Sequence, residues 1–448
     1  MALRKTVIDA MFYLSGSGIP RNLKEIKRYE YASNQELRAL TEEKLTKLLI
    51  YAYENVPYYH RILEQVGVVV KGTVRLENFG CVPLLTKEII RKEGANLYAK
   101  DYKTRKPYHN TSGGSTGEPI DFVQDKEYDQ WNTANKLYFN SVLGKEPGWR
   151  EIKLWGSDRD IIKGTLGPKD RIINYLYNRK FFNAYRLNDR TLSELVRLNN
   201  SFKPRAYWSY MESALELADF FSRNEIDFHP PDIVISTIAP LTERVRSKIE
   251  SAMKCKVYDQ YGSREVGALA CECRRQNGLH CFDWSHYTEV LDENNKPVTA
   301  EAGKIIVTTL CNYSMPLIRY DIGDVAEADS SECPCGRNTF RLKKILGRTL
   351  GYFKKSDGSL VHSHFIVQSL FFKDWIKKFQ IIQTQYDRVL IKLEKKDRST
   401  PPPPGDLEDI TEKTRILMGR ACVVDFEFVE EITKTQSGKL LYTICQVK

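Results

Sequence analysis

A glycine-rich stretch at residues 111–119 constrains this chain more than any other part of it. The stretch reads Thr-Ser-Gly-Gly-Ser-Thr-Gly-Glu-Pro. Glycine permits backbone angles that point successive N–H groups at one anion, and nearby hydroxyl groups can donate to the same anion. The stretch therefore predicts a phosphate-holding loop or a plain turn, since Gly/Ser clusters are also ordinary loop material. In a phosphate-holding loop, the donors would come from Ser112, Gly113, Gly114, Ser115, Thr116 and Gly117.

The ending of this stretch excludes one class of nucleotide site. A Walker A loop requires Gly-Lys-Ser/Thr at the start of a helix, whereas Glu118 and Pro119 follow the last glycine here. On the carboxyl side, residues 120–123 read as a strand and residues 128–143 as an amphipathic helix. A succession of strand, loop and helix predicts α/β architecture.

Later segments continue the same alternation. A strand signal at 205–210 precedes a helix signal at 212–221, and residues 232–238 read as a buried strand. That strand ends at Ala239 and Pro240. Ligands of α/β sheets bind at the carboxyl ends of strands, so both residues are candidates for nucleotide binding.

Three local patterns give further expectations. Residues 34–52 carry apolar side chains at helical spacing within a mainly helical first hundred residues. Residues 175–182 predict an aromatic helix, in a region that is a surface insertion or part of a substrate mouth. Residues 320–324 read Tyr-Asp-Ile-Gly-Asp and predict a polar turn.

The length predicts at least two domains, because 448 residues exceed what one hydrophobic core usually supports. After Gly347 the pattern changes to a smaller α+β module interrupted by a run of four prolines at 401–404. We therefore expect a large domain at 1–347 and a small one at 348–448.

Composition narrows the class of protein. The chain is 42% hydrophobic and 28% charged and has no long uncharged apolar run, so we expect a cytoplasmic enzyme without an integral membrane segment. The apolar stripe at residues 3–14 predicts a packed helix, with peripheral membrane contact as the alternative. The formal charge of +10 suits anionic small substrates as well as nucleic acid, and no nucleic-acid module is present. A homodimer or a biosynthetic complex stays open.

Four side chains have the composition of a structural zinc site. Cys273 and His280 lie seven positions apart, and Cys333 and Cys335 flank one proline. A Cys₃His set suits tetrahedral Zn²⁺ and leaves no open position, which would make residues 271–335 a clasp between two loops. Two alternatives remain: Cys271 or Cys281 replaces one ligand, or all ten cysteines are reduced thiols.

Five separated motifs together resemble those of the adenylate-forming superfamily of acyl-CoA synthetases, luciferases and adenylation domains. Within it, the likeness is to phenylacetate-CoA ligases and the CapK-like proteins of polysaccharide loci. The motifs are Ser-Gly-Gly-Ser-Thr-Gly-Glu-Pro at 112–119, Tyr-Gly-Ser-Arg-Glu at 261–265, Met-Pro-Leu-Ile-Arg-Tyr-Asp at 315–321, Glu-Cys-Pro-Cys-Gly-Arg at 332–337 and Thr-Gln-Ser-Gly-Lys at 435–439.

The resemblance implies a large N-terminal domain of mixed sheets and helices and a small mobile C-terminal domain. ATP's triphosphate would lie along residues 112–118, and Glu265 would hold Mg²⁺, which prefers carboxylate and phosphate oxygen. Asp324 would accept hydrogen bonds from the ribose, and Arg348 would assist there. Adenine would lie between the segment of Ala239 and Pro240 and the turn of Asp259, Gln260, Tyr261, Gly262 and Ser263.

Lys439 is the predicted catalytic lysine of the C-terminal module. By the resemblance it contacts the substrate carboxylate and the α-phosphate, where negative charge develops in the transition state. Without the resemblance, a lysine after Ser437 and Gly438 would be a solvated turn residue. One departure from relatives is the lack of an aspartate soon after Gly347 and Arg348, which weakens what can be carried over about the second half-reaction.

The implied reaction is ATP-dependent activation of a carboxylic acid, with pyrophosphate release and transfer of the acyl group to CoA. Transfer to an amine or hydroxyl acceptor is the alternative, and a non-catalytic nucleotide-binding protein is a third. The sequence does not name the acid. Tyr207, Tyr210 and Met211 could line an acyl pocket, although aromatic residues beside a strand also serve as plain core.

Overall fold

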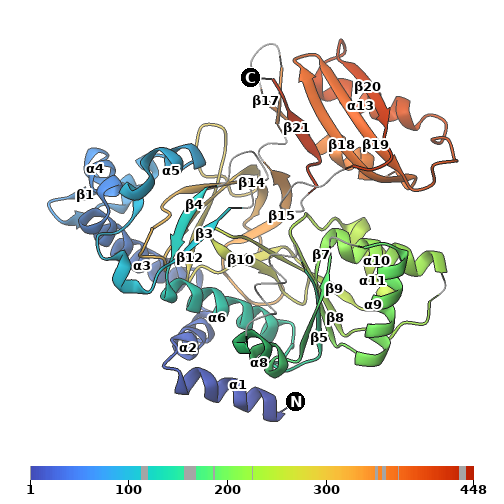
Figure 1. The fold of residues 1–448 in the computed structure, drawn as a ribbon. Coiled ribbons are helices and arrows are strands. Elements are labelled where there is room, and N and C mark those ends of the chain that lie inside the picture. The colour runs from blue at the N-terminus through green and yellow to red at the C-terminus, as the bar shows by residue number, and fades with distance from the viewer. Residues whose placement is uncertain are drawn as a thin grey trace. The chain divides into compact units, whose positions relative to one another are not determined.

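The computed structural model describes residues 2–112, 120–155, 168–184, 187–224, 226–348, 352–355, 360–371, 373–432 and 440–447. The chain forms two compact units (Figure 1). The first consists of Met1–Ser112, Ile120–Ile322 and Ala326–Ile345, and the second of Gly113–Pro119, Gly323–Val325 and Leu346–Lys448. Both contain helices and strands, so the α/β class predicted from the sequence is confirmed.

The first unit begins with helices, as the sequence predicted. In α3, the Ser33 hydroxyl accepts from the backbone N–H of Glu36, while the Glu36 carboxylate accepts from the Ser33 backbone. This capping box satisfies N–H groups that the first turn leaves without partners. The bounds are α1 Ala2–Leu14, α2 Ile19–Tyr29, α3 Asn34–Asn55, α4 Pro57–Gln65 and α5 Lys87–Glu93, with 3₁₀ turns η1 Leu76–Cys81, η2 Gly94–Leu97 and η3 Tyr102–Arg105.

An eleven-stranded sheet forms the centre of the first unit, in the order β12-β13-β14-β15-β11-β10-β9-β8-β7-β5-β6. Strands β6, β5, β7, β8 and β9 are parallel neighbours, whereas β9, β10, β11 and β15 pair antiparallel. The bounds are β5 Glu151–Trp155, β6 Arg179–Asn183, β7 Ala206–Tyr210, β8 Ile233–Thr237, β9 Lys256–Ser263, β10 Gly267–Glu272, β11 Leu279–Cys281, β12 His286–Leu291, β13 Ala302–Thr309, β14 Tyr320–Asp329 and β15 Arg341–Arg348. Smaller pairs are β1 Val69–Val70 with β2 Thr73–Val74 and β3 Tyr108–Thr111 with β4 Asp121–Gln124.

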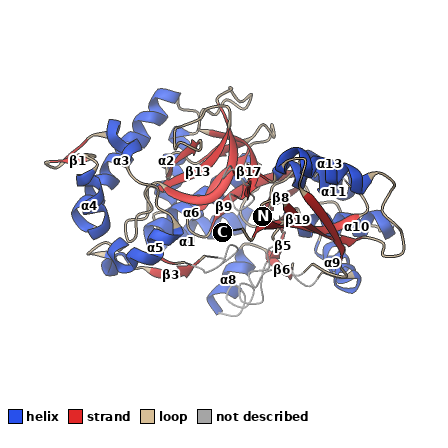
Figure 2. Cartoon of the chain, turned by 90° about the horizontal axis from the view of Figure 1, so that it is seen from above, coloured by secondary structure: helices blue, strands red, loops and turns tan. Residues whose placement is uncertain are grey.

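Helices cover the parallel half of this sheet on both faces. One core joins β5, β7 and β8 to α9, α10 and α11, and another joins β7 and β8 to α2 and α6. Both views show α3–α5 grouped at one end of the sheet and α9–α11 at the other (Figures 1 and 2). The bounds are α6 Lys126–Val142, α8 Pro168–Leu176, α9 Asp189–Phe202, α10 Met211–Asn224 and α11 Glu243–Met253.

Two local predictions were wrong. The aromatic segment 175–182 is not one helix, because α8 ends at Leu176 and Arg179–Asn183 forms β6, paired in parallel with β5. Residues 320–324 are not a turn but the start of β14, in which Gly323 takes a φ of +78°. In both places, pairing with a distant strand overrides the local signal.

The second unit has its own core around a four-stranded sheet in the order β20-β19-β18-β21. Strands β18 and β19 form an antiparallel hairpin, and β21 and β20 join its two sides in parallel. The bounds are β16 Tyr352–Lys354, β17 Leu360–His362, α12 His364–Phe371, β18 Ile376–Gln385, β19 Arg388–Lys395, α13 Asp406–Met418, β20 Val423–Phe428 and β21 Thr443–Cys445. Across both units, none of the helices that the structure describes could span a bilayer.

Candidate functional site

Glu265, the predicted Mg²⁺ ligand, lies in the tight connection between the antiparallel strands β9 and β10. The Gln124 side-chain amide, at the end of β4, donates to the carbonyls of Arg264 at 2.8 Å and Glu265 at 3.1 Å. The Tyr128 hydroxyl, on α6, lies 3.4 Å from the same Glu265 carbonyl. Two elements that lie more than one hundred residues earlier in the chain, β4 and α6, therefore fix the backbone at this carboxylate.

His286 and Tyr320 complete the support of the connection. Nε2 of His286 lies 2.8 Å from the carbonyl of Val266, which can only accept, so this nitrogen carries the proton. Burial lowers the pKa of His286 to about 4, which keeps the ring neutral. The Tyr320 hydroxyl donates to Oε1 of Glu265 at 3.4 Å, and no other described residue is recorded as a hydrogen-bond donor to this carboxylate. Glu265 is thus buried and held, with oxygen left for a hard cation.

The predicted adenine segment follows the same edge of the sheet. Ala239 and Pro240 come directly after β8, are half-buried, and follow Ile238, whose φ is +83°. Tyr261, Gly262 and Ser263 are not a separate turn but the end of β9, and all three are half-buried. A Cβ at Gly262 would lie 2.0 Å from the carbonyl oxygen of Gly267, so only glycine fits there.

Asp259 and Gln260 are more deeply placed on β9. The backbone N–H of Asp259 donates to Oε2 of Glu272 at 2.7 Å, and Arg246 holds both oxygens of Glu272 at 3.0 and 2.6 Å. Burial, reinforced by the Glu272 charge, raises the pKa of Asp259 to about 8 although Arg246 opposes the rise. The Asp259 carboxyl is therefore buried beside the ion pair that Glu272 forms with Arg246.

The remaining predicted nucleotide residues are only partly described. Ser112 is buried, and its hydroxyl and backbone both bond to Ile120, which closes the base of the glycine-rich stretch. Asp324 is buried on β14, and Arg348 is the last residue of β15. Outside the described residues lie Gly113, Gly114, Ser115, Thr116, Gly117 and Lys439.

The three acyl-pocket candidates separate in the structure. Tyr207 is fully buried in the core with α9–α11, where its hydroxyl donates to Oδ1 of Asn199 at 2.9 Å. Met211 is buried in the same core. Tyr210 is half-buried, and its ring centroid lies 4.9 Å from that of Trp155 at the end of β5. Of the three, Tyr210 is thus the one placed at the carboxyl edge of the parallel strands.

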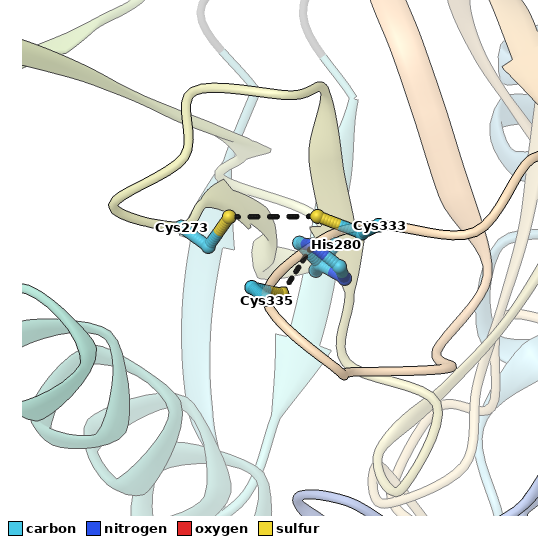
Figure 3. Close-up of side chains that lie close together, drawn as sticks. All are labelled: Cys273, His280, Cys333 and Cys335. Atoms are coloured by element: carbon cyan, nitrogen blue, oxygen red, sulfur yellow. Dashed lines mark hydrogen bonds between the residues drawn. The ribbon is translucent and has the colours of Figure 1, made fainter.

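The predicted zinc ligands converge on one point. One ligand atom from each of Cys273, His280, Cys333 and Cys335 lies within 4.8 Å of all the others. Figure 3 shows the four side chains turned toward one another, Cys273 from the end of β10, His280 from β11, and both other cysteines from the loop after β14. The sulfur atoms of Cys273 and Cys333 are 3.7 Å apart, and Nε2 of His280 is 3.4 Å from the sulfur of Cys335.

The surroundings of this cluster fix the histidine. Nδ1 of His280 lies 3.2 Å from the Thr339 hydroxyl, which leaves Nε2 directed at the cysteines. Burial lowers the pKa of His280 to about 4, with Arg341 and Arg337 adding to the effect, so the ring is neutral. Cys271 lies opposite His280 in the β10–β11 pairing and is not one of the converging group.

Several residues of the site were not found from the sequence. Gln124, Tyr128, His286 and Tyr320 contact the Glu265 connection, and Thr339 orients His280. A polar residue at the end of an apolar strand, as at Gln124, is the one local signal that could have indicated such a role.

Comparison with known proteins agrees with this geometry. Residues 353–446 match the family model described as CapK C-terminal domain. The phenylacetate-coenzyme A ligase of Thermus thermophilus is 27% identical over 331 residues, 71% of this chain and 72% of the relative. Protein CapK of Staphylococcus aureus is 24% identical over 436 residues, 95% of this chain and 92% of the relative.

Solved structures share the fold. A crystal structure of 2-hydroxyisobutyryl-CoA ligase, in the postadenylation state with R3-HIB-AMP, aligns with a TM-score of 0.73 at 21% identity, covering 94% of this chain and 92% of that one. With the motif order and the two curated relatives, this likeness makes the chain similar to the phenylacetate-CoA ligases and CapK proteins of the adenylate-forming superfamily.

Proposed function

We propose that this chain activates a carboxylic acid by attack of its carboxylate on the α-phosphate of ATP, with pyrophosphate as the leaving group, and then transfers the acyl group to coenzyme A. The observation that carries the proposal is the clamped Glu265 connection beside the half-buried segments of Ala239 and Tyr261. These lie where α/β sheets bind ligands. The similarity to phenylacetate-coenzyme A ligases names the class of reaction.

Each residue has a role that its surroundings suit. Glu265 would hold Mg²⁺, which neutralises charge on the phosphates when it is bound. Its backbone cannot shift without breaking the bonds from Gln124 and Tyr128, so the carboxylate is oriented before ATP arrives. We assign the ribose to Asp324 with Arg348, and the triphosphate to residues 112–117.

Zn²⁺ is the metal we propose for the Cys₃His cluster. Two thiolates on one tetrahedral zinc, at about 2.3 Å each, lie about 3.7 Å apart, and a thiolate and an imidazole lie about 3.5 Å apart. The distances of 3.7 and 3.4 Å fit both values. Thr339 would fix the ring orientation, as a hydrogen bond to the other nitrogen of a zinc-bound histidine usually does. The metal would be structural, because four protein ligands leave no place for substrate.

Lys439 gives the sharpest test of the adenylation step. We expect Lys439→Ala to abolish nearly all pyrophosphate release, a loss of at least about 100-fold, because the charge it supplies is needed only in the transition state. Release would be measured over a panel of carboxylic acids, with ATP binding as a second readout that stays unchanged.

Lys434→Ala is the matched control, since it removes a lysine from the same C-terminal stretch. Pyrophosphate release by Lys439→Ala at the wild-type rate would contradict the assignment. Absence of release from the wild-type protein with every acid would instead favour a non-catalytic nucleotide-binding protein.

An amine or hydroxyl group is a second candidate for the acceptor of the acyl group, in place of coenzyme A. This alternative is kept because residues 353–446 match a CapK domain, whereas the phenylacetate-coenzyme A ligase match covers only 71% of the chain. Mass spectrometry of the products formed with coenzyme A, hydroxylamine or a sugar amine would distinguish the acceptors.

A further inference from the structure

The side chains that lie together on β5, β6 and α6 and in the loop after α6, named here the lysine recess, carry more positive than negative charge. Lys153 projects from β5, Lys136 from α6, Lys145 from the loop after α6, and Arg179 from β6. Burial lowers the pKa of Lys153 well below its usual value, and the charges of Arg179 and Lys136 lower it further, so these groups influence one another. Glu151, on β5, is the acid that contacts two of them, and the charge of Asp129, on α6, opposes the lowering of the Lys136 pKa by burial.

Glu151 pairs with only two of these cations. Its carboxylate lies 2.8 Å from Nζ of Lys145 and 2.6 Å from Nε of Arg179. Burial raises its pKa, but Lys145, Arg179 and Lys153 outweigh burial and hold the pKa well below the usual range. Lys136 and Lys153 form no ion pair or hydrogen bond with any residue that the structure describes.

Two aromatic side chains contact Lys153. Its Nζ lies 4.6 Å from the ring centroid of Trp208 and 5.5 Å from that of Trp155. Trp208 is 4% exposed, and its indole Nε1 has no hydrogen-bond partner in the described part of the chain. Lys153 and Trp155 are half-buried, so each keeps some contact with solvent.

Such groups are costly without a ligand. A buried donor without a partner costs about 1–3 kcal/mol, and a desolvated ammonium costs more. Burial lowers the pKa values of Lys153 and Lys136, which favours their neutral amines, whereas a bound carboxylate would favour the ammonium forms and could also accept from the Trp208 indole N–H. Lys153 also lies two residues before the carboxyl end of β5, the sheet edge where α/β proteins bind ligands.

We propose that this recess binds a second, distal carboxylate of the acid that is activated, so that the substrates are dicarboxylic acids. The inference rests on the proposed function. Trp155 and Trp208 would contact the carbon chain of the acid, while Lys153, Lys136 and the indole N–H bind its charged end. Tyr210, whose ring contacts Trp155, then lies on the way to the activated end.

The test compares matched acids by calorimetry without ATP: succinate with butyrate, glutarate with pentanoate and adipate with hexanoate. In the wild type we expect one diacid to bind roughly 10- to 100-fold more tightly than its monoacid, as one or two charge-assisted hydrogen bonds supply. Lys153→Met should bring this ratio to about one. Lys180→Met is the control. Lys180 also contacts an aromatic ring, but it is an exposed residue of β6 and is not part of the recess.

A second measurement separates a ligand role from a structural one. Methionine fills the volume of lysine without its charge, so Lys153→Met should not lower the unfolding temperature. A diacid preference that survives Lys153→Met, or that is absent from the wild type, overturns the inference.

Measurements of diacid binding and of pyrophosphate release distinguish failure of the recess inference from failure of the adenylation proposal. Lys153-dependent diacid binding without pyrophosphate release would leave the recess standing and overturn the adenylation proposal. Pyrophosphate release with monoacids at undiminished efficiency, with no diacid preference, would overturn the recess and leave adenylation standing.

Discussion

The Cys₃His cluster and the lysine recess lie in the same unit, and both bury polar side chains, but only the cluster satisfies them. In the cluster, each ligand atom faces another and His280 is held from behind by Thr339. In the recess, no residue that the structure describes accepts from Lys153 or from the Trp208 indole N–H. This difference is the reason why we propose a structural metal for the cluster and an exchangeable ligand for the recess.

The largest effect should come from breaking the cluster. Cys273→Ser would remove one of four thiolate or imidazole ligands, and we expect it to lose the metal and to destabilise the first unit by on the order of 5 kcal/mol, since binding of a structural zinc contributes directly to folding free energy. Metal content by mass spectrometry and the unfolding temperature would be measured on protein purified without added zinc.

Cys81→Ser is the control, because Cys81 is exposed and distant from the cluster. Two results would contradict a structural metal: wild-type protein that contains no zinc after purification without added zinc, or a Cys273→Ser variant as stable as the wild type.

A smaller effect should distinguish paired from unpaired lysines within the recess. Lys145 contacts the Glu151 carboxylate, so Lys145→Met would leave that buried carboxylate with Arg179 alone. Removing one partner of a buried pair costs about 3 kcal/mol. Lys153→Met, which breaks no pair, should cost nothing. Urea unfolding of both variants measures this, and equal losses would contradict the distinction.

The sequence predicted much of the fold because its strongest signals are local. The capped helix α3 and the alternation around β7, α10 and β8 follow from periodicity and turn chemistry. The four residues predicted to bind zinc could be named because few residue types bind zinc, and their convergence required only that two loops meet.

Other features depend on contacts that no local pattern carries. Residues 179–183 become β6 because β5 offers a parallel edge, although their aromatic residues also suit a helix. The clamp on Glu265 joins β4, α6, β12 and β14 across more than one hundred residues of chain. The unpaired state of Lys153 is likewise visible only when its neighbours are in place.

Asp259 is the acidic counterpart of Lys153, since it is buried beside the ion pair of Glu272 with Arg246 and its backbone N–H donates to Glu272. Its pKa of about 8 in the folded protein lies above the usual value of about 3.9, so the folded state holds a proton that the unfolded state has released between about pH 4 and pH 8. The unfolding free energy must therefore fall as pH rises through this window, by at most about 1.4 kcal/mol per pH unit from this group.

Asp259→Asn should remove this share of the pH dependence and make the protein more stable than the wild type at pH 7.5, with a smaller difference at pH 5. Asparagine keeps the shape of the protonated acid, so the contacts of Glu272 with Arg246 would persist. Urea unfolding at several pH values measures the slopes, with the exposed Asp227→Asn as control. Parallel slopes for Asp259→Asn and the wild type would mean that Asp259 is ionised in the folded protein. The charge of the Asp259 carboxylate would then be neutralised by groups within the fold, unlike that of Lys153 in the recess.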